Sequence, residues 1–503
     1  MSMAKLGAPD RDFFAALADV VFGNPFTPQR DQLIVRLAPE APLGDLTSDR
    51  EALARVVGPR LEPWLREGPA ALQKLSAEDR RLLEPGFLYV CYQRCVPELD
   101  ALIEQQAGKG GAPLAVPFGD EAIADLVRSG FPEDRAVRYF AFFFQLRRAF
   151  YFILDSLAGE CESMRRLREA LWNNVVTHDM RGYEAALWNR MEDFSTLLLG
   201  ETGTGKGSAA AAIGRSEFIP YLPEQHRFAA NFAESFITIN LSQFPETLIE
   251  SELFGHRKGA FTGAIEHHEG VFERCNAHGA LFLDEIGEAS IPVQIKLLQV
   301  LQERTFTALG GHEKKRFSGR VIAATNRPLG ELRRGGRFRD DFFYRLCSDV
   351  IEVPTLRQRI AESPAELEQL VRLLVARVTG TQAPELVAGV LEALSGLPRS
   401  YAWPGNVREL EQAVRRILLT GRYAAESLPA APGEEDALLD KLRAGDLTAA
   451  DLLARYCALL YQRLGTYAEV AKRTGLDPRT SRKYVESGRT GKNEQGADRT
   501  GLP

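Results

Sequence analysis

Residues 195–206 read Ser-Thr-Leu-Leu-Leu-Gly-Glu-Thr-Gly-Thr-Gly-Lys, and this stretch decides the fold. The apolar residues 195–199 favour a short buried strand, and the alanine-rich residues 208–213 favour a helix. A glycine-rich loop that ends in lysine and joins a strand to a helix is the P-loop pattern. Its backbone N–H groups can surround phosphate oxygens, and Lys206 can reach the β- and γ-phosphates. The residues expected to bind phosphate are Gly200, Glu201, Thr202, Gly203, Thr204, Gly205, Lys206 and Gly207.

Two carboxylates complete this site in the sequence. Residues 280–283 form an apolar strand that ends at Asp284 and Glu285. In a parallel sheet this strand end lies beside the P-loop, where Asp284 can hold Mg²⁺ and Glu285 can polarise an attacking water. Gly207 stands where a P-loop usually has Ser or Thr for Mg²⁺, so the ion is expected to depend on Asp284, water or Ser208. Together the two motifs predict hydrolysis of a nucleoside triphosphate.

Further strands and helices surround these motifs. Residues 236–239 and 320–324 read as two more short strands, separated by helical segments. This alternation predicts an α/β fold with a parallel-sheet core. Residues 366–378, 384–394 and 406–419 read as helices that follow the sheet.

The first 160 residues have a different character. Leucine, alanine and aromatic residues recur there at helical spacing, so we expect an all-α domain. It has no phosphate loop, metal cluster, nucleophile or receiver-domain signature. Residues 139–157 are the most apolar stretch, but charged residues interrupt it, which indicates a buried helix and not a membrane span. The N-terminus has no apolar signal region, so the protein is expected to be cytoplasmic and to have no membrane partner.

Composition sets broader limits. The chain has 503 residues, a net charge of −6, 45% hydrophobic and 26% charged residues, which suggests about three domains. These values exclude a collagen-like, disordered or disulfide-scaffold protein, and a globally basic nucleic-acid coat. The six cysteines are scattered and are expected to be reduced thiols.

A run further along the chain carries a specific resemblance. Residues 250–264 read Glu-Ser-Glu-Leu-Phe-Gly-His-Arg-Lys-Gly-Ala-Phe-Thr-Gly-Ala. This run resembles the signature of the AAA+ activators of sigma-54 RNA polymerase, the bacterial enhancer-binding proteins, and the resemblance extends over residues 163–420. The last six residues of this run, 259–264, form a hexapeptide. In that family the hexapeptide lies at the tip of a loop that touches sigma-54 and moves with the nucleotide state. The hexapeptide alone could equally be a buried turn, although one aromatic among glycines and alanines also suits a mobile contact loop. The resemblance therefore implies sigma-54 contacts from Gly259, Ala260, Phe261, Thr262, Gly263 and Ala264.

The same resemblance implies roles for five more residues. Asn240 is similar to the switch residue that can hold Glu285 inactive, and Asn326 to the sensor of the γ-phosphate. Arg339 and Arg345 resemble arginine fingers that reach the ATP site of a neighbouring subunit, and without the family each would be read as an ordinary surface ion pair. Arg408, in the sequence Trp-Pro-Gly-Asn-Val-Arg (403–408), resembles the lid arginine that contacts phosphate.

The chain departs from the family pattern at two places. The stretch between Lys206 and Asn240 is longer than usual, and its prolines suggest an inserted loop. Gln358 stands where a glutamate is common.

The C-terminal region reads as a helix–turn–helix. Thr466 and Glu469 form a capping box that opens one helix, and Asp477 with Pro478 begins another after Gly475. Residues 466–492 hold seven Lys or Arg and three Asp or Glu, a net charge of +4 within an acidic chain. The unit resembles the Fis-type DNA-binding unit of the same family, although a basic helix with a packing role would have a similar sequence. The residues expected to contact double-stranded DNA are Arg479, Thr480 and Arg482 on bases, and Lys483 on phosphate.

The resulting expectation is a sigma-54-dependent transcription regulator that binds ATP with Mg²⁺, binds DNA, forms a homo-oligomer such as a hexamer, and acts on the sigma-54 RNA polymerase holoenzyme. Two alternatives remain: an AAA+ ATPase that remodels another protein client, and a DNA-binding regulator with a vestigial ATPase. The N-terminal domain is expected to control ring assembly in response to a ligand or partner that the sequence does not identify. The expected regions are an N-terminal regulatory domain (1–160), an ATPase core (161–357), a lid (358–425), a linker (426–445), a DNA-binding domain (446–487) and a disordered tail (488–503).

Overall fold

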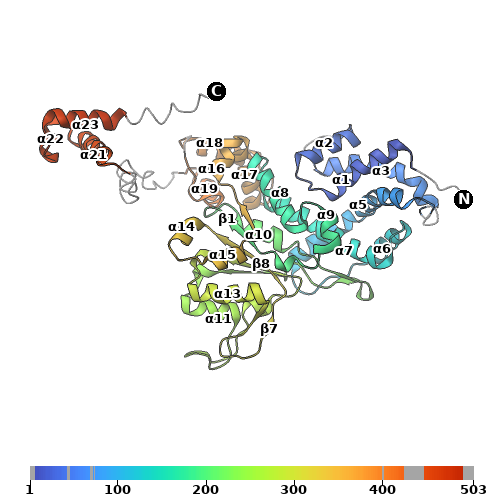
Figure 1. Cartoon of the computed structure of the whole chain (residues 1–503). Coiled ribbons are helices and arrows are strands. Elements are labelled where there is room, and N and C mark those ends of the chain that lie inside the picture. Colours follow the sequence, from blue (N-terminus) through green and yellow to red (C-terminus); the bar gives the residue numbers. More distant parts are fainter. Residues whose placement is uncertain are drawn as a thin grey trace. The chain divides into compact units, whose positions relative to one another are not determined.

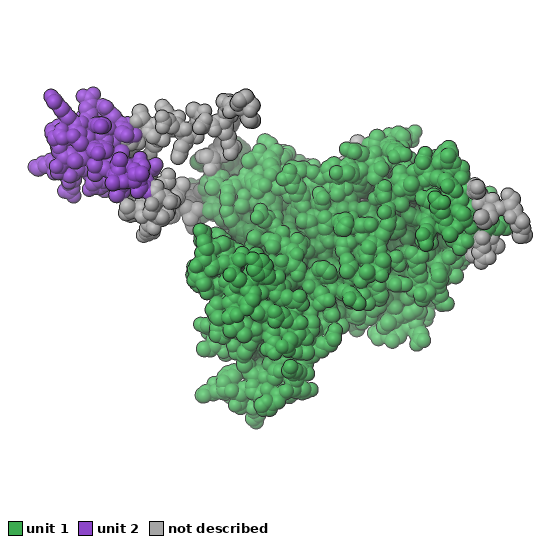
Figure 2. Space-filling view, viewed as in Figure 1, with its two compact units in different colours: residues 1–423 green, residues 424–503 purple. Residues whose placement is uncertain are grey.

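The computed structural model describes residues 6–41, 46–67, 72, 74–398, 401–423 and 447–490. The chain divides into two compact units, residues 1–423 and 424–503 (Figure 2). The expected linker, residues 426–445, lies outside the described residues, as does the expected tail from residue 491 onwards.

A five-stranded parallel sheet forms the centre of the first unit (Figure 1). Its strand order is β4-β5-β8-β1-β9. Its strands are β1 (Thr196–Leu199), β4 (Phe236–Asn240), β5 (Ala280–Asp284), β8 (Arg320–Thr325) and β9 (Asp349–Glu352). The predicted α/β fold and its first four strands are confirmed; β9 was not predicted. In register, Asn240 lies opposite Asp284, so polar residues at the carboxyl ends of β4 and β5 share one edge of the sheet.

The two faces of this sheet belong to different hydrophobic cores. Along β5, Ala280 and Phe282 pack with α10 (Lys206–Gly214) and with N-terminal helices. Leu281 and Leu283 pack with α11 (Glu246–Phe254) and α13 (Ile291–Glu303). This alternation is the two-residue period of a strand that is covered on both faces. The remaining elements of the core are α8 (Glu162–Val176), α9 (Met180–Gly182), a π-helical turn (Tyr183–Leu187), α11 (Glu246–Phe254), α12 (Val271–Arg274), α13 (Ile291–Glu303), β6 (Thr305–Phe306), β7 (Lys315–Arg316), α14 (Leu329–Arg334) and α15 (Asp340–Leu346).

The N-terminal region consists mainly of helices, as predicted, with an isolated bridge from Ala115 to Arg227. Its helices are α1 (Ala8–Phe22), α2 (Pro28–Leu37), α3 (Leu46–Glu67), α5 (Ala77–Lys109), α6 (Gly119–Arg128) and α7 (Glu133–Ser156). The apolar stretch 139–157 lies in α7 apart from Leu157, which caps the helix, and α7 contacts α10, the helix after the P-loop. None of the described helices is both long and apolar enough to cross a membrane.

The long stretch after the P-loop helix forms a small hairpin of β2 (Tyr221–Leu222) and β3 (Arg227–Phe228). Its aromatic side chains pack on α7: the Phe228 ring stacks on Phe144, with centroids 4.0 Å apart, and on Phe140 at 5.7 Å. This expected insertion therefore joins the N-terminal helices to the α/β core.

Four helices form the lid: α16 (Leu356–Glu362), α17 (Ala365–Thr379), α18 (Pro384–Ser395) and α19 (Asn406–Thr420). They share their own hydrophobic core. The second unit contains α21 (Ala449–Leu464), α22 (Tyr467–Thr474) and α23 (Pro478–Thr490) around a core with Cys457, Val470 and Val485. Residues 488–490 belong to α23, so the helix extends into the segment where a disordered tail was expected.

Candidate nucleotide site and contact surfaces

The P-loop turns sharply between β1 and α10. Gly203 and Gly205 have φ of +79° and +106°, values that side chains with a Cβ rarely adopt. Lys206 is 7% exposed, and its ammonium donates to the carbonyls of Gly200 at 2.8 Å and Glu201 at 3.0 Å. Burial lowers the pKa of Lys206, while the carboxylates of Glu285 and Asp284 oppose that shift. The lysine, the loop and both carboxylates therefore form one electrostatic cluster.

The carboxylate pair lies at the end of β5. Asp284 accepts a hydrogen bond from the Asn240 side-chain amide at 3.1 Å, and Asn240 itself accepts from the Ser242 N–H at 2.9 Å. Glu285 has a φ of +54°, which is unusual for a residue with a side chain. Burial first, and then the charge of Asp284, raise the pKa of Glu285. In this conformation the described contact of Asn240 is with Asp284, the direct neighbour of the glutamate it was expected to hold.

Asn326 connects the sheet to the P-loop. Its side-chain amide donates to the Thr202 hydroxyl at 2.9 Å, and its backbone N–H donates to Glu285 at 3.4 Å. The residue expected to sense the γ-phosphate thus contacts both the loop and the glutamate.

The lid reaches the same loop through the start of α19. A Cβ on Gly203 would lie 2.2 Å from the Gly405 carbonyl and 3.0 Å from the Cβ of Arg408. The charge of Arg408 also contributes to the lowered pKa of Lys206. The expected lid arginine is therefore close to the P-loop lysine.

Asn406 is a connection that the sequence reasoning missed. It is fully buried, and its amide donates to Glu201 at 3.2 Å and to the Thr202 carbonyl at 3.1 Å. Its side-chain oxygen accepts the Leu356 N–H at 2.8 Å. Arg357 pairs with Glu201 and lowers the pKa of that carboxyl. The lid segments that contain Arg357 and Asn406 therefore both contact the P-loop. Asn406 lies within the sequence 403–408, but only Arg408 of that sequence was predicted to have a role.

Two cavities flank the P-loop. One, of about 580 Å³, lies between Gly200, Glu201, Asn326, Gln358 and the α8 residues Ser163 and Arg166. The other, of about 410 Å³, is lined by Gly207, Asn240 and Asp284 among others. The first has room for a nucleoside and the second holds the carboxylate expected to bind Mg²⁺. Residues of α8 and Gln358 had no predicted part in this site.

The oxygen ligands of the second cavity suit Mg²⁺, which prefers carboxylate, water and phosphate oxygens. Asp284 supplies a carboxylate, and Gly207 supplies no hydroxyl. The residues present therefore fit an ion that is held by one protein carboxylate, with phosphate and water completing its ligands.

The hexapeptide 259–264 forms the turn of a surface loop between α11 and α12. Gly259 and Gly263 have φ of +83° and +105°, and a backbone bond joins the N–H of Gly259 to the Ala264 carbonyl at 2.8 Å. Phe261 is 38% exposed, and its ring meets His256 edge-on with centroids 5.0 Å apart. The turn is therefore not buried. The loop between β6 and β7 supports its base, because His256 bridges to Leu309.

Comparison with known proteins identifies this region. Residues 180–352 match the family described as Sigma-54 interaction domain. The central region of the chain is therefore similar to this family. A Nif-specific regulatory protein of Azotobacter vinelandii is 36% identical over 345 residues, which cover 66% of this chain and 58% of that protein. The DNA-binding transcriptional regulator NtrC of Azospirillum brasilense is 41% identical over 225 residues, covering 45% and 43%.

The chain thus spans about half the length of the curated relatives it matches. Among solved structures, that of NtrX from Brucella abortus in complex with ATP has a TM-score of 0.40 and 22% identity, and covers 73% of this chain and 79% of that one.

The two expected arginine fingers lie near the end of the matched region, residues 180–352, on and beside α15. Arg339 precedes the helix, is partly exposed, and pairs with Asp341 at 2.7 Å. Arg345 donates twice to the Leu301 carbonyl at the end of α13, at 2.9 and 2.7 Å. Within one subunit, both guanidinium groups are thus held by neighbours other than the P-loop.

The C-terminal unit has the predicted helix–turn–helix elements. Thr466 and Asp477 cap α22 and α23 as expected: Thr466 accepts the Glu469 N–H at 3.4 Å, and Asp477 accepts the Thr480 N–H at 3.1 Å. The Thr480 hydroxyl also donates to Asp477, and Arg482 pairs with Glu486 at 2.8 Å. Among the described residues, Arg479 and Lys483 have no such side-chain partner and are the expected DNA contacts with unengaged charges.

Proposed function

We propose that this protein is a sigma-54-dependent transcription activator, which binds double-stranded DNA and uses ATP hydrolysis to remodel the RNA polymerase holoenzyme. One observation carries the proposal: the exposed Phe261 loop belongs to the same compact unit as a P-loop and the Asp284–Glu285 pair. An exposed aromatic on a glycine-hinged turn suits contact with another protein.

The nucleotide site supports ATP hydrolysis. The P-loop backbone and Lys206 would bind the phosphates, and Asp284 would hold Mg²⁺, which neutralises developing charge on the phosphates. Glu285, with its raised pKa, would orient and deprotonate the attacking water. Arg339 and Arg345 of a neighbouring subunit would stabilise charge in trans, which requires a homo-oligomer such as a hexamer.

A short path connects this chemistry to the loop. Asn240 contacts Asp284 and ends β4, immediately before a turn and α11. At the other end of α11, the Ser251 hydroxyl and the His256 ring are 2.7 Å apart, and His256 contacts Phe261. A change in the Asn240 contact on ATP binding or hydrolysis would thereby shift α11 and reorient the loop.

The helix–turn–helix would place the protein on DNA. Phosphate contacts contribute most of the affinity and base contacts contribute specificity, so Arg479→Ala should weaken binding and relax specificity. Arg455→Ala is the matched control, because Arg455 is an exposed arginine of the same unit on α21. Equal loss of binding in both variants would contradict a recognition role for α23.

The decisive experiment separates the loop from the ATPase. Phe261→Ala should retain ATP turnover and lose nucleotide-dependent binding to sigma-54 and open-complex formation. Phe194→Ala is the control, since Phe194 is an aromatic with a similar exposed fraction, 40%, outside the loop. Unchanged activation by Phe261→Ala would overturn the proposal.

The two alternatives predict different results. A remodeller of another client would be recovered with that client and without sigma-54. A vestigial ATPase would show equal ATP turnover in the wild type and in Glu285→Gln, whereas we expect the variant to lose turnover and retain ATP binding. The proposed location of an activator of this kind is the bacterial cytoplasm.

A further inference from the structure

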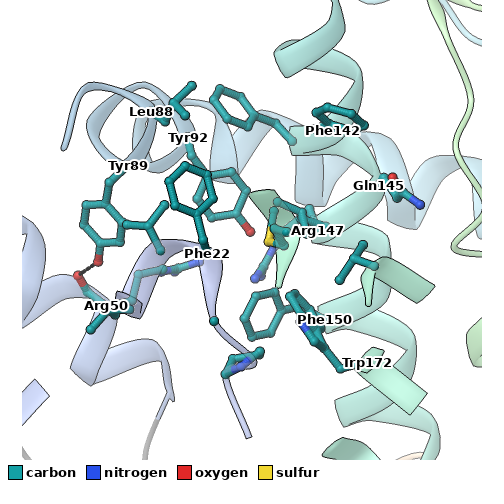
Figure 3. Close-up of a pocket in the computed structure, with 18 of the residues that line it drawn as sticks. Phe22, Arg50, Leu88, Tyr89, Tyr92, Phe142, Gln145, Arg147, Phe150 and Trp172 are labelled. Carbon is teal, nitrogen blue, oxygen red and sulfur yellow. Dashed lines mark hydrogen bonds between the residues drawn. The ribbon is translucent and has the colours of Figure 1, made fainter. Parts of the chain in front are cut away.

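A cavity of about 130 Å³ lies among the N-terminal helices and α8, away from the nucleotide site (Figure 3). Aromatic side chains make up much of its wall, among them Phe22, Tyr89, Phe142 and Phe150. An engineered apolar cavity of about 150 Å³ holds a benzene molecule, so this space suits a ligand with an apolar body of similar size.

Four residues that line this cavity each have a buried hydrogen-bond donor with no partner among the residues that the structure describes. These donors are Nε of Arg50, the Tyr92 hydroxyl, the side-chain amide of Gln93 and Nε1 of Trp172. Trp172 is only 2% exposed, so its indole N–H is also largely shielded from bulk water. Buried donors are almost always hydrogen-bonded, and a buried donor without a partner lowers stability. Their position in the wall of one cavity indicates that a bound molecule supplies the acceptor.

The charges around the cavity favour an anion. Arg30 pairs with Asp49 at 3.4 Å, Arg147 with Asp100 at 2.8 Å, and the one acidic lining residue, Glu184, with Arg135 at 3.5 Å. Arg50 has no carboxylate within ion-pair distance among the described side chains. It is held in place instead by its backbone, whose carbonyl accepts the Tyr89 hydroxyl at 2.7 Å (Figure 3). The uncompensated charge of the lining is therefore positive.

We propose that this cavity binds a small apolar monocarboxylate, with its carboxylate on Arg50 and the Trp172 indole N–H and its apolar body among the aromatic rings. A guanidinium matches a carboxylate in both charge and geometry. A phosphate ester would require further unpaired cations, and a neutral hydrocarbon would leave all of these donors unpaired.

The elements that line the cavity also contact the ATPase core. On α7, Gln145 lines the cavity and donates to the Ser216 carbonyl at 3.0 Å, just beyond the P-loop helix. The buried neighbour Arg148 donates to the carbonyls of Arg215 and Glu217, both at 2.7 Å. Occupancy of the cavity can therefore alter the packing of α7 against the helix that follows the P-loop.

The helix α8, which contains Trp172, provides a second connection between the cavity and the central sheet. Two residues after Trp172, Asn174 donates to Asp349 of β9 at 2.7 Å and accepts from Thr196 of β1 at 3.0 Å. We therefore expect the ligand to change ATP turnover as well as to bind. Binding itself does not depend on the sigma-54 function, so the two proposals can fail separately.

The test is isothermal titration calorimetry of the 503-residue chain with benzoate, phenylacetate and hexanoate, each compared with its neutral amide. At least one carboxylate should bind with one-to-one stoichiometry and about tenfold more tightly than its amide, because charge-assisted hydrogen bonds are lost in the amide. Arg50→Gln should weaken binding by about tenfold to a hundredfold, and Trp172→Phe, which keeps an aromatic ring, by less. The bound probe should also change the rate of ATP turnover.

Arg55→Gln is the matched control, because Arg55 is an exposed arginine on the same helix as Arg50. It should bind the probe like the wild type. If Arg50→Gln does not fold, the comparison of carboxylate with amide and the Trp172→Phe variant still test whether the cavity binds a carboxylate. The proposal is overturned if no carboxylate binds at millimolar concentration, if the amides bind equally well, or if Arg50→Gln binds like the wild type. Binding without any change in ATP turnover overturns the coupling.

Discussion

At the scale of single residues, Glu285 has an unfavourable backbone conformation and an unfavourable environment for its carboxylate. Its backbone is left-handed, and its carboxyl is partly buried beside Asp284. Strained residues with displaced pKa values concentrate at functional sites. The free-energy cost of keeping this carboxylate ionised should be measurable as a lower stability of the folded protein.

We expect Glu285→Gln to raise the melting temperature at neutral pH in the absence of nucleotide. The pKa of Glu285 is higher in the folded protein than its usual value of 4.5, so the folded state binds the proton more tightly than the unfolded chain does. The ionised carboxylate therefore lowers stability at neutral pH, and this penalty disappears as the pH falls below 4.5. Thermal unfolding of both proteins across this pH range tests the expectation, and a difference that grows on acidification would contradict it.

Gly207→Ser should lower the Mg²⁺ concentration that gives half-maximal ATP turnover. A Cβ at this position meets nothing within 4 Å, so the side chain can be accommodated without rearrangement. The added hydroxyl offers the ligand that other P-loops have, and ~1 kcal/mol of extra binding corresponds to a change of about fivefold. Gly207→Ala controls for the helix, since it adds the Cβ without the oxygen. An equal effect of both substitutions would show that the hydroxyl is not the cause.

The phosphate loop and the carboxylate pair could be predicted because each occupies a contiguous stretch with a fixed relation to a strand. Asn406 could not be predicted in the same way. Its contacts with Glu201 and Leu356 join segments about 205 and 50 residues away in the sequence, and depend on how the lid closes. The Asn240–Asp284 bond could be expected only after β4 and β5 were known to be neighbours in register.

At the scale of elements, the hairpin of β2 and β3 determines how the N-terminal helices are attached. Its prolines predicted an insertion. Its packing partner α7 could not be predicted from the local sequence, because aromatic side chains can pack against many different apolar surfaces. The strand β9 was missed for a local reason: Asp-Val-Ile-Glu has only two apolar residues and no period.

Phe228→Ala should destabilise the first unit by about 3–5 kcal/mol, the usual cost of removing a fully buried phenyl ring. Phe228 is fully buried and stacks on Phe144, so the loss should fall on the contact between the hairpin and α7. Chemical denaturation measures the change, and limited trypsin digestion should release fragments from the N-terminal region. Tyr344→Ala, at a 71% exposed ring, should leave both measurements unchanged. Identical digestion of Phe228→Ala and the wild type would argue against this attachment.

At the scale of the whole molecule, the proposed ring can be tested by mixing two inactive proteins. Glu285→Gln subunits retain Arg339, and Arg339→Ala subunits retain Glu285, so mixed rings should regain ATP turnover at interfaces that combine the intact residues. Mixing Glu285→Gln with Lys206→Ala is the control, because those two defects belong to the same subunit's site and no interface is restored. Absence of recovery in the first mixture would show that Arg339 does not act in trans.

A chain that begins at residue 161 should be less stable than the full-length protein and aggregate more readily. The P-loop helix α10 shares its buried core with α7, so truncation exposes apolar surface of the ATPase. Light scattering and the melting temperature provide the comparison. Point substitutions in the cavity are therefore better tests of regulation than deletion of the N-terminal region.

The contact between α7 and the hairpin also constrains the order of events during synthesis. Phe144 leaves the ribosome 84 residues before Phe228, its stacking partner, which is a delay of several seconds or more at roughly 5–20 residues per second. During that interval the aromatic face of α7 has no native cover from the hairpin. We therefore expect the nascent N-terminal region to expose apolar surface of the kind that chaperones bind until the P-loop and its hairpin have been translated.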